Sequence, residues 1–181
     1  MAPEPHHVVT APSRTFRNDS QRDCYEYVAQ LLGEIFGDGV VVHPDLPTFR
    51  VLMGSTAVDL TVYAFERDAV VHLRALVVHG ARPDLDLYET LLRQNAKLVA
   101  GAFSIDADGD IAFTHTIPVL SATDTAKPSD SGSDDKARDR PRPPITRASL
   151  ERDVVNVLDV ADHFDDFIQG RWGGQRTIDR G

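Results

Sequence analysis

The fold of this chain is decided by residues 101–118, which read Gly101-Ala-Phe-Ser-Ile-Asp-Ala-Asp-Gly-Asp-Ile-Ala-Phe-Thr-His-Thr-Ile-Pro118. Asp108 and Gly109 stand near the middle, and these residue types accept the positive φ angles of tight turns. Apolar residues alternate on both sides of this point, as they do in strands that bury one face. The alternating residues are Phe103, Ile105, Ile111, Phe113 and Ile117. The pattern predicts a β-hairpin that reverses at Asp108-Gly109.

Three aspartates of this hairpin, at positions 106, 108 and 110, match the first, third and fifth positions of a calcium-binding EF-hand loop. The match then fails, because Ile111 stands where that loop needs glycine and Ile117 where it needs a bidentate glutamate. The stretch also resembles the first motif of haloacid-dehalogenase phosphatases. A second strand follows too soon for the crossover that a parallel sheet needs. We therefore interpret the aspartates as a solvated turn and expect no metal site.

Length and charge narrow the class of protein. The chain has 181 residues, enough for one domain, and its 19 basic and 28 acidic residues give a net charge of −9. This charge disfavours a nucleic-acid partner. No apolar run approaches the roughly 18 residues that span a bilayer, and the N-terminus lacks a signal-peptide core, so we expect a cytoplasmic protein without membrane contact. The excess of Arg over Lys suggests a GC-rich bacterial genome.

Segments without apolar periodicity set the expected domain boundaries. We expect a disordered tail at residues 1–18 and a disordered insertion at residues 121–144. We expect a second tail at residues 173–181. A single domain would then comprise residues 19–120 and 145–172. The one cysteine, Cys24, has no partner for a disulfide or a zinc site and is expected to be a small buried hydrophobic residue.

Three segments carry apolar residues at helical spacing. Residues that can cap a helix begin each segment, and the first and third stop at glycine. The first segment begins at Asp19 or Ser20 and stops at Gly37. The second begins at Asp84 and ends near Leu98, and the third begins at Thr146 and stops at Gly170. The only tryptophan, Trp172, follows the third segment beside two glycines. It either fixes the helix end to the core or serves an exposed contact.

Residues 48–53, 57–65 and 69–78 are rich in β-formers and are joined by short connections, which predicts an antiparallel meander. Residues 40–43 could form an edge strand or only an extended lead-in. The fold class is therefore α+β, with an antiparallel sheet of five strands, or six with 40–43, in the order α-β-β-β-α-β-β-α. Alternation assigns one face of the meander to the core: Phe49, Val51, Met53, Val58, Leu60, Val62, Ala64, Val71, Leu73, Ala75 and Val77.

The second face of the meander is mixed in character, with Leu52 and Leu76 among polar side chains. Its other members are Arg50, Asp59, Thr61, Tyr63, His72 and Arg74, and Thr114 joins them if the hairpin continues the sheet. A peptide could lie across this face or pair with an exposed strand edge. An ordinary solvated sheet face would show the same residues.

Several short sequence segments match those of a known family: Leu91-Leu-Arg-Gln-Asn95, Gly101-Ala-Phe103, Asp108-Gly-Asp-Ile111, Phe113, Ile117-Pro118 and Val160-Ala-Asp162. With the element order, they resemble the type III secretion chaperone-like fold of the secretion chaperones and the YbjN family, over about residues 20–171. The insertion at 121–144 departs from that compact pattern. The resemblance implies a peptide-binding chaperone or adaptor, commonly dimeric, without a catalytic constellation. We expect Leu87 and Leu91 in the seam of a homodimer.

No clustered catalytic groups stand out. The histidines are dispersed, and the acidic surroundings of His163 are typical of a solvated helix face. The sequence therefore predicts a non-enzymatic chaperone or adaptor that holds a segment of a client protein and needs no cofactor. The alternative is a small-molecule-sensing or regulatory domain without catalysis. That function requires an enclosed apolar pocket, which a sequence cannot show.

Overall fold

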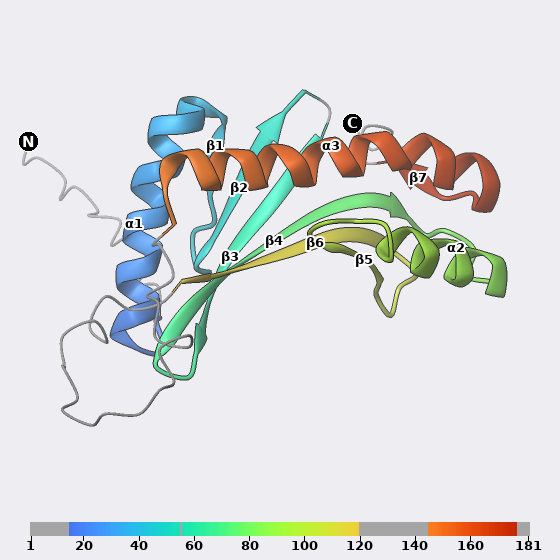
Figure 1. The fold of residues 1–181 in the computed structure, drawn as a ribbon. Helices are drawn as coiled ribbons and strands as arrows, with labels where there is room; N and C mark the ends of the chain where they lie inside the picture. The colour runs from blue at the N-terminus through green and yellow to red at the C-terminus, as the bar shows by residue number, and fades with distance from the viewer. Residues whose placement is uncertain (1–14, 55, 120–144, 177–181) are drawn as a thin grey trace, which may run out of the picture.

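A computed structural model describes residues 15–54, 56–119 and 145–176 (Figure 1). The predicted disordered insertion at 121–144 and most of the two predicted tails, at 1–14 and 177–181, lie outside these ranges. The elements are, in chain order, α1 (Asp19–Phe36), the short 3-10 helix η1 (Gly37–Gly39), β1 (Val40–Val42), β2 (Thr48–Met53), β3 (Thr56–Phe65), β4 (Asp68–His79), α2 (Leu85–Asn95), β5 (Ala102–Ile105), β6 (Ile111–Val119), α3 (Arg147–Trp172) and β7 (Gln175–Arg176).

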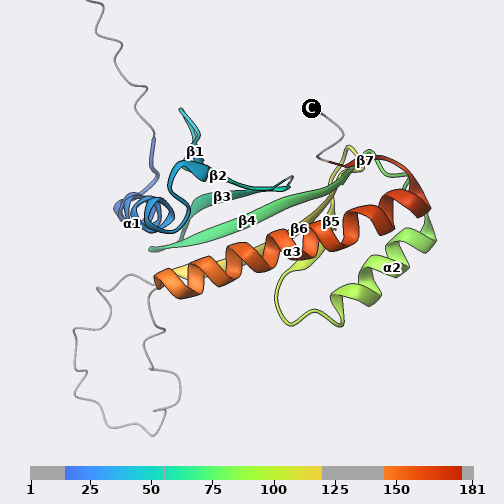
Figure 2. The ribbon, with the colours of Figure 1, turned by 90° about the horizontal axis from the view of Figure 1, so that it is seen from above.

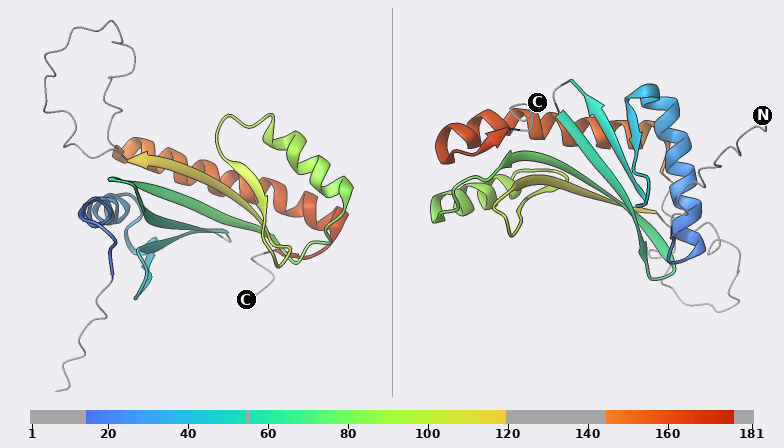
Figure 3. Two further views of the ribbon diagram at one scale, coloured as in Figure 1. Left: turned by 90° about the horizontal axis from the view of Figure 1, so that it is seen from below. Right: turned by 180° about the vertical axis from the view of Figure 1, so that it is seen from behind.

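The strands form one antiparallel sheet in the spatial order β1-β2-β3-β4-β6-β5, which confirms the α+β class and the predicted order of elements. The uncertain run at 40–43 is a true strand over Val40–Val42, so the sheet has its sixth strand. β4 and β6 lie side by side along most of their length (Figure 3). The two-residue β7 also pairs with β4, at Val78 and His79, and was not predicted.

The predicted hairpin is β5 and β6, and the turn between them places Gly109 at φ 81°. Gly101, just before β5, is required for a second reason. An added Cβ there would lie 2.5 Å from Cζ of Phe113 and 2.8 Å from the carbonyl oxygen of Thr114. The hairpin can therefore close against the start of β5 only with glycine at this position.

α1 begins and ends at residues with clear local reasons. Asn18, in extended conformation, caps it by accepting a hydrogen bond from the Gln21 N–H at 2.8 Å, one residue before the predicted caps. Gly37 ends it as predicted, with φ 53°. Phe16 packs on Tyr25 at 5.4 Å between ring centroids. The predicted tail over 1–18 is therefore wrong for its last residues.

α3 continues past its predicted end. Gly170 keeps a helical conformation, and the positive φ angles that terminate the helix occur at Gly173 and Gly174, at 74° and 95°. Trp172 is buried in the core, and its carbonyl accepts a hydrogen bond from the Arg82 N–H at 3.0 Å, so it fixes the helix end. Because β7 follows at once, the predicted tail over 173–181 is wrong for its first residues.

One face of the sheet is the core face, on which α1 and α3 pack. Tyr25 of α1 stacks on Phe49 at 4.5 Å, and Phe164 of α3 contacts Phe103 edge-to-face at 4.9 Å. α1 and α2 lie at opposite ends of the long α3 (Figure 2). Cys24 is buried as predicted, and that burial raises the pKa of its thiol to about 12. None of the described helices combines the length and apolar character needed to cross a membrane.

The predicted core face is nearly right. Two of its residues are exceptions, because Met53 lies exposed at the end of β2 and Ala64 is only partly buried near the end of β3. Val77 and Val78 are both buried, although two successive residues of a regular strand point to opposite faces of the sheet. A bulge in the pairing of β4 with β6, between Leu76 and Val78, shifts the alternation and explains this pair.

α2 ends at Asn95, earlier than predicted, and its buried residues correct the expected dimer seam. Leu87 and Leu91 are only 1% and 5% exposed, and they belong to the core of the single chain. The prediction that they face a second copy is therefore wrong, since the chain itself covers them. Leu85 and Leu92 of the same helix are the exposed leucines instead.

Candidate functional site

The predicted site residues lie together on the sheet face opposite the core face, which we call the open face. Alternation along β2, β3, β4 and β6 places them there, and strand pairing arranges them in rows across the sheet. Arg50, Asp59, Arg74 and Thr114 form the charged row. Thr48, Thr61, His72 and Thr116 form the hydroxyl row beside it. Tyr63 lies one row further along β3, opposite Val70.

Two ion pairs order the charged row. Arg50 donates from Nε and Nη2 to the two carboxylate oxygens of Asp59, at 2.7 Å and 2.8 Å. This hydrogen bonding raises the pKa of the Arg50 guanidinium. Arg74 instead donates from Nη2 to Oδ2 of Asp106, at 3.1 Å. Asp106 belongs to the turn between β5 and β6, so this turn reaches the open face.

The hydroxyl row is joined by hydrogen bonds between neighbouring strands. The Oγ1 atoms of Thr48 and Thr61 lie 3.0 Å apart, and Nδ1 of His72 lies 3.0 Å from Oγ1 of Thr116. Burial lowers the pKa of His72, and the positive charge of Arg74 and the neighbouring His115 lower it further. The neutral imidazole is therefore favoured at this position, where it can donate or accept a hydrogen bond.

Large apolar side chains flank these polar rows. Tyr63 is 50% exposed, Phe65 59%, Leu52 51% and Val41 52%. Sequence reasoning missed Phe65 and Val41. Phe65 continues the alternation of β3 two residues after Tyr63, so that signal was present. Val41 joins the open face only because β1 is a strand that pairs Val41 with Arg50.

The aspartates of the hairpin turn bind the protein's own backbone. Oδ1 of Asp106 accepts hydrogen bonds from the amides of Asp108 and Asp110, at 3.1 Å and 3.0 Å. Asp110 accepts from the Gly80 amide at 2.9 Å and lies 2.5 Å from Nδ1 of His79. The described residues contain no group of three or more His, Cys, Asp or Glu side chains placed to hold a metal ion.

One edge of the sheet is covered by a side chain. Asn95, the last residue of α2, accepts a hydrogen bond from the Phe103 N–H at 2.7 Å and donates to the Phe103 carbonyl at 3.2 Å. These are the two bonds that a neighbouring strand would make with β5. A peptide therefore cannot pair with β5 at Phe103 unless Asn95 moves.

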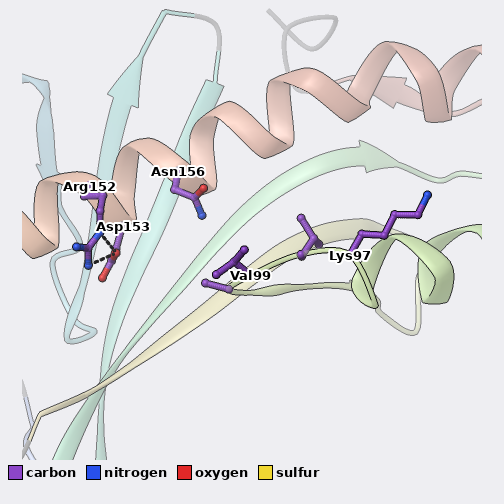
Figure 4. Close-up of a pocket in the computed structure, with 7 residues that line it drawn as sticks. Lys97, Val99, Arg152, Asp153 and Asn156 are labelled. Atoms are coloured by element: carbon purple, nitrogen blue, oxygen red, sulfur yellow. Dashed lines mark hydrogen bonds and ion pairs between the residues drawn. The ribbon is translucent and has the colours of Figure 1, made fainter.

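A pocket that sequence reasoning missed lies between the segment after α2 and the first half of α3 (Figure 4). Its volume is ≈ 410 Å³, within the range of about 300–1,000 Å³ typical of small-molecule sites. The side chain of Arg152 donates to Asp153 at 3.0 Å on one wall. The sequence gives no signal for it, because the two walls are far apart in the chain. The lining residues are Lys97, Leu98, Val99, Ala100, Arg152, Asp153 and Asn156.

His163 and its acidic neighbours Asp162 and Asp166 are exposed on α3. The His163 ring packs edge-to-face on Phe164 at 5.0 Å between centroids. Asp166 pairs with Arg176 of β7 at 2.5 Å, which holds β7 against α3. Burial raises the pKa of the Asp165 carboxyl, and the neighbouring Asp166 and Asp162 raise it further.

Comparison with known proteins agrees with one part of the predicted resemblance. The family model YbjN, with the description "Putative bacterial sensory transduction regulator", matches residues 43–128. This range includes β2, β3, β4, α2, β5 and β6, and thus the strands of the open face other than β1. No curated protein matches the chain. The wider type III secretion chaperone-like classification stays a prediction. The match over residues 43–128 supports the predicted resemblance to the YbjN family for the part of the chain that holds these strands.

Proposed function

We propose that this protein is a non-enzymatic regulatory adaptor that binds a segment of a client protein across the open face of its sheet. The observation that carries this proposal is the exposure of large apolar side chains beside ordered polar rows. The solvated face of an antiparallel sheet is ordinarily polar. Four half-exposed apolar side chains on one such face suggest an interaction surface. The regulatory description of the family supports the same role.

The two kinds of residue on the open face suit the binding of a polypeptide. Tyr63 and Phe65 offer large rigid contact areas, and Tyr63 also carries a hydroxyl group. The Thr116 hydroxyl and the His72 imidazole, which contact each other in the structure, can each donate a hydrogen bond to a client backbone or accept one from it. Because the pKa of His72 is lowered, the imidazole can serve in its neutral form at neutral pH. Binding across the face is also favoured over pairing with β5, whose edge Asn95 occupies.

The test compares two exposed tyrosines. Peptides selected on an array that tiles the host's proteins are measured in solution by fluorescence anisotropy. Tyr63→Ala should weaken their binding by about 1 kcal/mol or more, as expected of an aromatic contact residue. Tyr88→Ala removes a similarly exposed tyrosine from α2 and should leave binding unchanged. Equal binding by both variants, with native circular dichroism, would contradict the proposal.

A second candidate function, small-molecule sensing without catalysis, is favoured by the pocket between α2 and α3. Its lining combines the apolar residues Leu98 and Val99 with the polar residues Asn156 and Arg152. Val99→Trp would fill the pocket from an exposed position. If sensing is the function, this variant should abolish ligand-induced thermal shifts and leave peptide binding intact.

A further inference from the structure

The two arginines of the charged row are held in different ways. Arg50 binds both oxygens of Asp59, which lies directly opposite it on the neighbouring strand. Arg74 makes one contact of 3.1 Å, from a single guanidinium nitrogen to Asp106. Asp106 is not part of the row, since it lies in the turn after β5. Arg50 is therefore held by two hydrogen bonds within the row, whereas Arg74 has a single partner from a separate element.

The contact between Arg74 and Asp106 can open without disturbing the turn. Oδ1 of Asp106 accepts the amide hydrogen bonds that shape the turn, from Asp108 and Asp110, whereas Oδ2 is the oxygen that reaches Arg74. The side chains of Arg74 and Asp106 are 37% and 42% exposed. Ion pairs with such exposure contribute little to stability. An incoming ligand that displaces Asp106 from Arg74 therefore loses little free energy in breaking this ion pair.

The charge of Arg74 determines which chemical group of a ligand can replace Asp106. Both oxygens of Asp59 already accept a hydrogen bond from Arg50, so the charge of Asp59 is paired within the row. A ligand that displaced Asp106 from Arg74 without supplying a negative group would leave a desolvated cation without a hydrogen-bonded partner, which is unfavourable. A carboxylate can bind the guanidinium through two parallel hydrogen bonds, a stronger arrangement than the present single contact.

From this geometry we propose that Asp106 is a stand-in for an acidic side chain of the client, which takes its place on Arg74. The inference rests on the proposed function and specifies the chemistry of the bound segment. Leu76 lies two residues from Arg74 along β4, and Val70, opposite Tyr63, lies four residues away on the other side. At about 3.3 Å per residue, a segment extended along β4 would place its side chains over these positions in step. The client segment carries an acidic residue with an apolar residue two positions to one side and an apolar residue four positions to the other.

The test uses short synthetic peptides of this pattern, in both chain directions, each with a counterpart in which glutamine replaces glutamate. Asp106→Asn keeps the amide oxygen that accepts the turn hydrogen bonds but removes the charge that competes for Arg74. Asp108→Asn is the matched control, because it makes the same charge change in the same turn while Asp106 keeps its contact. Asp106→Asn should tighten binding of the glutamate peptides about two- to fivefold relative to Asp108→Asn, the range expected for loss of an exposed ion pair.

Arg74→Gln should abolish the preference for glutamate over glutamine peptides, and Asp106→Asn should bring no gain in that background. If the peptides bind but Asp106→Asn equals Asp108→Asn, or glutamate and glutamine peptides bind alike, the inference is wrong and the proposed function stands. If neither the wild type nor any variant binds the peptides, or their binding ignores Tyr63→Ala, both are wrong. Thermal unfolding of each variant verifies that the fold is retained.

Discussion

Asn95 binds both backbone groups of Phe103, accepting from its N–H at 2.7 Å and donating to its carbonyl at 3.2 Å. The last residue of α2 therefore holds the edge strand β5. Asn95→Ala removes both hydrogen bonds and should lower the free energy of unfolding by about 1–3 kcal/mol, measured by urea denaturation. It should also promote association through the uncovered edge, visible as increased light scattering. Gln94→Ala, at the neighbouring position, is the control, and equal effects of the two variants would disprove this role.

Two glycines should respond to alanine in opposite ways. Gly101 has φ +78°, and a Cβ there would meet Phe113 at 2.5 Å, so Gly101→Ala should destabilise the protein by at least about 2 kcal/mol. Gly170 is helical and has no atoms within 4 Å of an added Cβ, so Gly170→Ala should stabilise it by about 0.5–1 kcal/mol. Thermal and urea unfolding of both variants test the pair. A destabilising Gly170→Ala would show that this end of α3 is not a regular helix.

His72 should make stability depend on pH in a defined direction. Its pKa is lowered in the folded protein, first by burial and then by Arg74 and His115, so the unfolded chain binds the proton more readily. This contribution to stability is therefore present above the unfolded pKa, about 6.5, and is lost as the pH falls below it. His72→Gln should reduce the loss of stability between about pH 7.5 and pH 5. His163→Gln, on the surface of α3, is the comparison, and an unchanged pH dependence in His72→Gln would contradict the prediction.

We propose that the protein forms a homodimer through the exposed side of α2. Leu85, Tyr88 and Leu92 are 84%, 43% and 69% exposed and recur at helical spacing, beside the stripe that the core covers. Leu92→Glu should convert the dimer to a monomer in sedimentation experiments. Leu52→Glu places the same charge on the open face and should leave the mass unchanged. A monomer mass for the wild-type protein would rule out the dimer.

Local patterns account for the parts of the site that could be predicted. Alternation in β3 has a period of two residues, so placing Leu60 in the core necessarily places Asp59, Thr61 and Tyr63 on the other face. Thr114 follows by the same reasoning once Phe113 is assigned to the core. This local information was sufficient for these polar residues of the open face. It was not sufficient for Val41, which joins the face through the pairing of β1, or for the ion pairs.

Features that depend on distant segments were beyond the sequence. The bulge near Val78 and the pairing of β7 depend on contacts between residues far apart in the chain. Helical spacing could not show what packs on Leu87 and Leu91, so the sequence analysis placed them in a dimer seam, whereas the core of the single chain covers them. The role of Asp106 was invisible for the same reason, because Arg74 lies on another strand.

The most direct test of client binding on the open face is photo-crosslinking from single positions. A benzophenone amino acid is placed at position 65 on the open face, at 92 on α2 or at 99 in the pocket, each exposed in the wild-type protein. A bound peptide from the array should crosslink efficiently from position 65 and only at background level from 92 and 99. Crosslinking from 92 or 99 without crosslinking from 65 would contradict binding on the open face.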